Sequence, residues 1–225
     1  MDTAALRTEQ ARLAGLVCLA DDLPAEPRLI AGADTSSTRF DPERLVYAAI
    51  VLLEWPSLRE VARAGEVAPA PIPYIPGLLG FREVPALAAC WARLPERPDL
   101  LFVDGQGALH PRRFGIACQA GVTLGVPSIG VAKSRLVGEA EGALGAEEGS
   151  SLPIRFRGEA LGVLLRSRRG ANPLHVSPGH RISLATAEAW VRRTLRGGRR
   201  LPEPTRLAHL AAGDLRRLRA GAGAT

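Results

Sequence analysis

The stretch Leu100-Leu-Phe-Val-Asp-Gly-Gln-Gly107 is the most strand-like segment of this 225-residue chain. Its four apolar residues end in a carboxylate, Asp104, followed by a glycine turn, which predicts a short buried strand with a charged end. Two other segments have the same form. Residues 28–34 run through apolar positions to Asp34, and residues 127–133 run to Lys133. If these strands are neighbours in one sheet, their charged ends converge.

The elements around these strands predict a single α/β domain that spans residues 1–225. Apolar periodicity indicates an N-terminal helix within residues 1–22, and strands at 45–54 and 58–67 that form an antiparallel meander with the first strand. We further expect a proline-rich loop at 69–76, helices at 81–93, 113–124 and 183–195, a hairpin of 159–167 with 174–177, a surface loop at 138–153, and a flexible tail at 201–225.

The charge distribution is uneven along the chain. Residues 1–154 carry 14 basic and 19 acidic side chains, a net charge of −5, whereas residues 155–225 carry 15 arginines and 4 acidic side chains, a net charge of +11. Dense arginine favours a polyanionic partner such as nucleic acid, although an ordinary solvated surface has the same composition. The three cysteines have no zinc spacing and fit reduced thiols, and no apolar run is long enough for a membrane span. These features favour a cytoplasmic protein.

The two strand-end aspartates predict a metal site. Asp34 and Asp104 would repel each other if they met without a cation between them, and Mg²⁺ prefers such oxygen ligands, with Mn²⁺ as a substitute. Glu83, near the start of a predicted helix, is a third candidate carboxylate. Taken singly, each aspartate could equally cap a turn. Together, in a basic protein, the carboxylates favour metal-dependent phosphodiester chemistry.

Lys133 is the single lysine of the chain, beside 28 arginines. A lysine supplies a compact point charge that can reach one phosphate oxygen, so we predict a catalytic position for it, with an ordinary surface lysine as the alternative. Among the four histidines, His110 and His180 lie in loops flanked by proline or glycine, where either could bind a metal or relay a proton. The alternative for each is a loop residue that is satisfied by backbone hydrogen bonds. Nothing comparable marks His175 or His209.

Five motifs in order resemble the endonuclease V family over residues 28–206. They are Ala31-Gly-Ala-Asp34; Pro73-Tyr-Ile-Pro-Gly77 through Phe81-Arg-Glu83; Val103-Asp-Gly-Gln-Gly107 with His110-Pro-Arg-Arg-Phe-Gly115; Pro127-Ser-Ile-Gly-Val-Ala-Lys133; and Val176-Ser-Pro-Gly-His-Arg-Ile-Ser183. The resemblance implies a ribonuclease H-like α/β fold with a mixed sheet flanked by helices. It also implies Mg²⁺-dependent hydrolysis on the 3′ side of deoxyinosine in DNA during DNA repair, with 5′-phosphate ends and a monomeric enzyme.

The resemblance also implies roles for individual residues. Asp34, Glu83 and Asp104 match the acidic centre, and the position of His180 is expected close to it, while Lys133 faces the scissile phosphate. Tyr74 matches a tyrosine that wedges into the duplex. Backbone around the base pocket is expected at Gly77, Leu79, Gly80, Gly105 and Gly130, beside His110.

The resemblance leaves the substrate open, and it is not complete. Gln106 stands where many relatives have histidine, which removes the basis for a catalytic role at that position. Two alternatives remain: an endoribonuclease that acts on inosine in RNA, because contacts to a 2′-hydroxyl cannot be read from these motifs, and a non-catalytic module that holds nucleic acid through its arginine-rich part.

Overall fold

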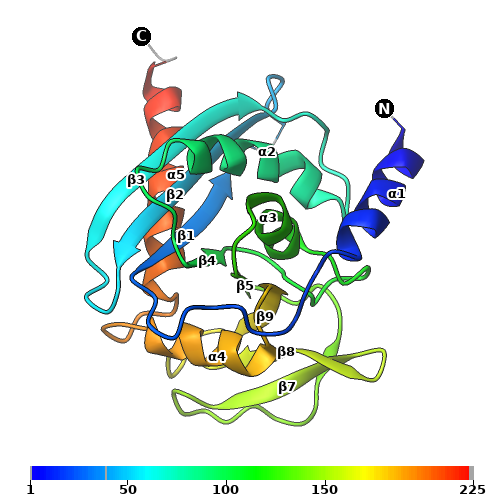
Figure 1. Ribbon diagram of the computed structural model, residues 1–225, viewed down its shortest axis with the longest axis vertical. Helices are drawn as coiled ribbons and strands as arrows, with labels where there is room; N and C mark the ends of the chain where they lie inside the picture. The colour runs from blue at the N-terminus through cyan, green and yellow to red at the C-terminus, as the bar shows by residue number, and fades with distance from the viewer. Residues whose placement is uncertain (1, 39, 223–225) are drawn as a thin grey trace.

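The structure is a computed structural model that describes residues 2–38 and 40–222, and in this part of the chain one large mixed sheet is flanked by helices (Figure 1). The sheet order is β3-β2-β1-β4-β5-β9-β8-β7-β6. The strands are β1 Leu29–Ser36, β2 Leu45–Glu54, β3 Glu60–Pro69, β4 Leu100–Val103, β5 Ser128–Ala132, β6 Glu139–Ala140, β7 Ser151–Phe156, β8 Glu159–Leu165 and β9 Leu174–His180. The helices are α1 Thr3–Ala14, α2 Leu79–Ala92, α3 Ile116–Leu124, α4 Leu184–Arg193 and α5 Glu203–Ala222.

The three strands with charged ends are neighbours at the centre of the sheet. β1 and β4 are parallel with Ala33 opposite Val103, and β4 and β5 are parallel with Val103 opposite Gly130. The antiparallel meander of β1, β2 and β3 is confirmed, as is the hairpin of β8 with β9. Since parallel neighbours end at the same edge of a sheet, the residues after β4 and β5 lie beside the end of β1.

The two faces of the sheet are covered by different helices. Ala31 and Val103 belong to the apolar cluster formed with α2 and α3, whereas Ile30 and Phe102 belong to the cluster formed with α4 and α5. In Figure 1, α2 and α3 lie in front of the sheet and α5 lies behind it. Because successive side chains on a strand point to opposite faces, Asp34 and Asp104 lie on the α5 face.

The expectation of a flexible tail at 201–225 is wrong for the described residues up to 222. Glu203–Ala222 form the 20-residue helix α5, which packs along β1 and β2. Ala208, Ala211 and Ala212 recur at helical spacing and are fully or nearly buried against the sheet. Gly32 permits this close approach, since a Cβ on it would lie 1.9 Å from the carbonyl oxygen of Pro204. Residues 223–225 lie outside the described part.

Three smaller expectations need correction. The N-terminal helix ends at Ala14, and the chain then continues without helix toward β1. The predicted loop at 138–153 contains β6 and the start of β7, because this segment finds strand partners in the hairpin. The apolar residues around the three cysteines predict buried thiols, but only Cys90 and Cys118 are buried, and Cys18 is exposed. Among the described residues, no helix combines the length and apolar character that a bilayer crossing needs.

Candidate active site

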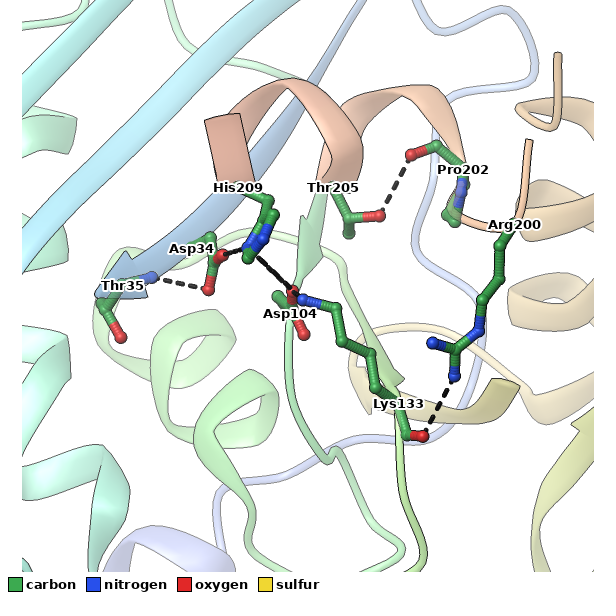
Figure 2. A network of polar contacts seen from close by, with 8 residues as sticks. All are labelled: Asp34, Thr35, Asp104, Lys133, Arg200, Pro202, Thr205 and His209. Atoms are coloured by element: carbon green, nitrogen blue, oxygen red, sulfur yellow. Dashed lines mark hydrogen bonds and ion pairs between the residues drawn. The ribbon is translucent and has the colours of Figure 1, made fainter. Parts of the chain in front are cut away.

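Three side chains from distant parts of the chain converge at the ends of β1 and β4. Potential ligand atoms of Asp34, Asp104 and His209 all lie within 4.8 Å of one another. His209 Nδ1 is 2.7 Å from Asp34 Oδ2 and 3.9 Å from Asp104 Oδ2 (Figure 2). The Lys133 ammonium forms an ion pair with Asp104 and lies 3.4 Å from His209 Nδ1. The charged strand ends therefore meet, as expected from the sequence.

The backbone explains why these side chains meet. Ala33 and Val103 are paired in register, so the next residue of each chain segment is an aspartate on the same face. Asp34 is held by its own neighbour, because the Thr35 N–H donates to Asp34 Oδ1 at 2.7 Å. At the start of α5, the Thr205 hydroxyl donates to the Pro202 carbonyl at 3.0 Å. The first turns of α5 thereby present His209 to the aspartates.

The electrostatics of the cluster favour a cation. Burial, followed by the charge of Asp104, raises the pKa of Asp34 from 3.8 to about 6, against the opposing hydrogen bond from His209. Asp104 Oδ2 is a buried atom that accepts no hydrogen bond, and its close partner is the Lys133 ammonium in the ion pair. Two converging carboxylates, the buried Asp34 and the partly buried Asp104, form with one imidazole a donor set that fits a hard divalent ion, which would offset their repulsion.

Glu83 approaches the same site from the opposite face of the sheet. It lies in the second turn of α2, where the Thr35 side chain hydrogen-bonds to its carboxylate. Burial is the largest cause that raises the pKa of Glu83 from 4.5 to about 7, and the charges of Asp34 and Asp104 add to it. Glu83 is thus close enough to sense both aspartates, although it is not among the three potential ligands.

His180 does not join this cluster, contrary to expectation. It pairs with Ser128 at the start of β5, roughly 10 Å along the strand from the level of Asp104. Its Nδ1 accepts the backbone N–H of Cys18 at 3.3 Å. The histidine at the site is His209, which the sequence did not single out. The available signal was its place on α5, directly after the buried Ala208 and two residues before the buried Ala211.

A small cavity of about 100 Å³ is lined in part by Tyr74. Five of the expected substrate-binding residues line it, namely the expected wedge Tyr74 together with Gly77, Leu79, Gly80 and His110. Burial, followed by the charge of Arg112, lowers the pKa of His110 from 6.5 to about 4, so this imidazole is neutral near pH 7. Gly80 leaves space for the side chain of Gln119, because a Cβ at residue 80 would lie 2.2 Å from the side-chain oxygen of Gln119.

Gly105 and Gly130 are not among the lining residues of this cavity. A Cβ on Gly130 would lie 2.4 Å from Gly107 N and 2.7 Å from Gly105 O, so these glycines bring two backbones together beside the site. Gln10 of α1 lines the cavity although the sequence did not indicate it, and its amide donates to the Gly77 carbonyl at 2.8 Å. Gln106 also lines it and donates to the Ser134 carbonyl at 2.9 Å.

Comparisons with known proteins agree with this arrangement. Residues 11–210 match the endonuclease V family. The chain is 52% identical to endonuclease V of Rhodospirillum centenum over 192 residues, which cover 84% of this chain and 79% of that protein. The crystal structure of endonuclease V from Streptomyces avermitilis is 37% identical and superimposes with a TM-score of 0.87 over 98% of this chain and 95% of that one.

A further neighbour carries nucleic acid. The Ciona intestinalis endonuclease V, solved with a 23-mer DNA containing an inosine followed by a ribo-adenosine, is 26% identical, with a TM-score of 0.79 over 96% of this chain and 97% of that one. The fold that these structures share confirms the expected ribonuclease H-like architecture. The family match over most of the chain, together with the convergent acidic site, shows that this chain belongs to the endonuclease V family.

Proposed function

We propose that this protein is a Mg²⁺-dependent DNA-repair endonuclease that hydrolyses the phosphodiester backbone on the 3′ side of deoxyinosine and leaves a 5′-phosphate. The observation that carries the proposal is the convergence of Asp34, Asp104 and His209. A small cavity lined by Tyr74, and by Gln106 two residues after Asp104, adds to it. A related endonuclease V has been solved with inosine-containing DNA, which supports the same substrate here. All potential ligands come from one chain, so we propose that the monomer is active.

In this mechanism the side chains hold the phosphate and control protons. Asp34 and Asp104 would bind Mg²⁺, which supplies charge stabilisation of a phosphate oxygen and lowers the pKa of water. His209 orients Asp34 through the 2.7 Å contact. Lys133 places an ammonium beside Asp104, where it can approach a phosphate oxygen. Glu83, with its pKa near 7, can hold or release a proton close to neutral pH.

The cavity and its wall account for lesion recognition. An enzyme that reads a base inside a duplex must take that base out of the stack. The cavity beside Gly77 and Gly80 offers backbone surface for an extruded base, and His110 remains neutral at its wall. Tyr74 is 68% exposed and can fill the space that the base leaves. We therefore propose that Tyr74 stabilises the opened strand.

A nicking assay with a deoxyinosine oligonucleotide tests this function. The wild type should cut the inosine strand on its 3′ side in Mg²⁺ and should not cut after chelation, whereas Asp34→Ala and Asp104→Ala should lose cleavage. Asp214→Asn is a matched control, because this exposed carboxylate on α5 pairs with Arg217 away from the site. Cleavage that survives removal of either Asp34 or Asp104 would contradict the proposed centre.

The alternative substrate is inosine in RNA. The Ciona protein was solved with a ribonucleotide directly after the inosine, which gives this alternative a specific basis. Matched DNA, RNA and single-ribonucleotide substrates should be compared side by side. Preferential cleavage of RNA would assign the enzyme to RNA, and binding without cleavage in any divalent ion would favour the non-catalytic alternative.

A further inference from the structure

We call the small cavity of about 100 Å³ that Tyr74 and Gly77 line the base cavity. It is one of three hollows that lie in a row and share lining residues. Tyr74 and Leu79 line both the base cavity and a second hollow of about 610 Å³, which Glu83 also lines. The second hollow shares Thr38, Phe40 and Asp41 with a third hollow of about 280 Å³. The row therefore runs from the base cavity, past Glu83, to the third hollow. We call the second and third hollows together the trough.

The far end of the trough is formed by α5. Arg216 and Arg219 line the third hollow. They follow His209 by seven and ten residues, which corresponds to ~10–15 Å along a helix, or a few nucleotides of a strand. Figure 1 shows α5 continuing along the sheet to the C-terminal end of the chain. The same helix thus supplies the histidine of the acidic site and two cations farther along.

The two arginines are positioned for an anion. Arg216 Nη1 donates to the carbonyl of Ser37 at 3.2 Å. Ser37 lies three residues after Asp34, so this hydrogen bond holds the guanidinium at the wall of the trough. Arg219 lies 3.7 Å from Glu43, and both side chains are about 60% exposed. Exposed pairs of this kind contribute little stability, so a phosphate can replace Glu43 as the partner of Arg219.

Phe40 supplies an aromatic surface midway along the trough. It lines both hollows, and the residue is 87% exposed. Aromatic rings in a basic groove bind single-stranded nucleic acid because every base offers a face for stacking. An aromatic side chain followed by two arginines therefore matches the chemistry of a base followed by its phosphates.

We propose that the trough binds the substrate strand on the 3′ side of the cut, with Phe40 stacking on a base and Arg216 and Arg219 contacting phosphates. This inference rests on the proposed function, because the direction of the strand follows from cleavage on the 3′ side of the inosine. Tyr74 lies between the base cavity and the trough, because it lines both, and Glu83, the carboxylate next to the acidic site, lines the trough. A strand anchored by its extruded base and cut at the carboxylates continues into the trough.

Two inosine oligonucleotides test the proposal, one extended by a full helical turn on the 3′ side and one ending just beyond the cut. The wild type should cut both, with a lower KM and a steeper salt dependence for the long one. In the Arg216→Gln/Arg219→Gln variant the salt slope of log(kcat/KM) for the long substrate should fall by about two, one for each lost phosphate contact, with little change for the short one. Arg217→Gln is the matched control, since Arg217 lines none of these hollows.

Two single variants probe the same surface. Phe40→Ala should raise KM for the long substrate roughly tenfold, and Phe40→Trp should restore it. Glu43→Gln should lower KM for the long substrate, because it frees Arg219. Melting temperatures near the wild-type value would show that these exposed substitutions leave the fold intact.

The outcomes separate the trough from the proposed function. A wild type that cuts neither inosine substrate overturns the proposed function. A wild type that cuts both with equal KM overturns the trough alone, as does a double arginine variant that weakens the long and short substrates equally. If Arg217→Gln has an effect as large as that of the double variant, the net positive charge of the protein explains the effect, and the positions of Arg216 and Arg219 in the trough do not. That result would also overturn the trough.

Discussion

Gly32→Ala tests whether the acidic site depends on the close approach of α5 to β1. A Cβ on residue 32 would lie 1.9 Å from the Pro204 carbonyl oxygen, whereas ordinary contact begins near 3.4 Å. The start of α5 must therefore move by about 1.5 Å, the difference between these distances. The atom in the way is backbone, so no side chain can rotate to relieve the clash. Five residues later on α5, His209 makes its 2.7 Å contact with Asp34, which a shift of this size would break.

The substitution should therefore affect both stability and catalysis. Overpacking of this kind costs about 1–3 kcal/mol of unfolding free energy. A displacement of about 1 Å in a catalytic group can cost ~100-fold in rate, so kcat for inosine cleavage should fall at least that far. Thermal unfolding and single-turnover cleavage measure the two effects separately, and Mg²⁺ titration by melting temperature reports the metal site.

Gly213→Ala is the matched control for this experiment. It makes the same chemical change on α5, but a Cβ there meets only the Arg217 guanidinium at 3.4 Å. Alanine in a helix interior stabilises by about 0.5–1 kcal/mol relative to glycine, so this variant should melt higher and cut normally. The reasoning would be refuted by a Gly32→Ala protein that keeps wild-type stability and wild-type kcat, or by equal effects of the two substitutions.

Three further predictions concern the site itself. Raised pKa values mean that the protonated carboxyls of Asp34 and Glu83 stabilise the metal-free protein at low pH, and that this contribution is lost as pH rises to about 6 and about 7. Mg²⁺ should raise the melting temperature, and this increase should become larger as the pH rises through this range. The increase should be smaller in Asp34→Asn. An increase that does not depend on pH would contradict the prediction. His209→Ala should lower kcat/KM ~100-fold in the nicking assay with little change in melting temperature, since the side chain is half exposed. Tyr74→Ala should raise KM for inosine DNA roughly tenfold and change single-turnover kcat less, and equal losses in both would argue against the wedge.

The central strands and their charged ends could be predicted from the sequence because each is encoded locally. A continuous apolar run such as residues 100–103 is typical of a strand that is buried on both faces. A carboxylate directly after such a run does not belong to the apolar core, so it marks a candidate site residue. Parallel pairing then brings Asp34 and Asp104 together without any further information. The base-cavity residues, in contrast, came from the resemblance of the motifs and not from periodicity.

The role of α5 could not be predicted because its burial depends on a partner far away in the chain. Its sequence is rich in arginine and alanine, which is also typical of an exposed segment. The helix packs tightly only because Gly32, more than 170 residues earlier, leaves room for Pro204. The sequence therefore does not single out His209, whereas the proline and glycine before His180 predict a loop, although this residue lies within β9.

The single lysine has a physical explanation in this arrangement. Lys133 contacts Asp104, and its ammonium lies 3.4 Å from His209 Nδ1. If Asp34 and Asp104 bind a divalent cation, their oxygens must stay accessible beside this ammonium. An arginine there could bind both oxygens of Asp104 through its planar fork and would compete with the metal for them. An ammonium is a point charge that balances part of the negative charge while it leaves carboxylate oxygens open. The lysine thus stands at the place where an arginine would compete with the cation for Asp104, whereas many of the arginines form ion pairs elsewhere in the chain.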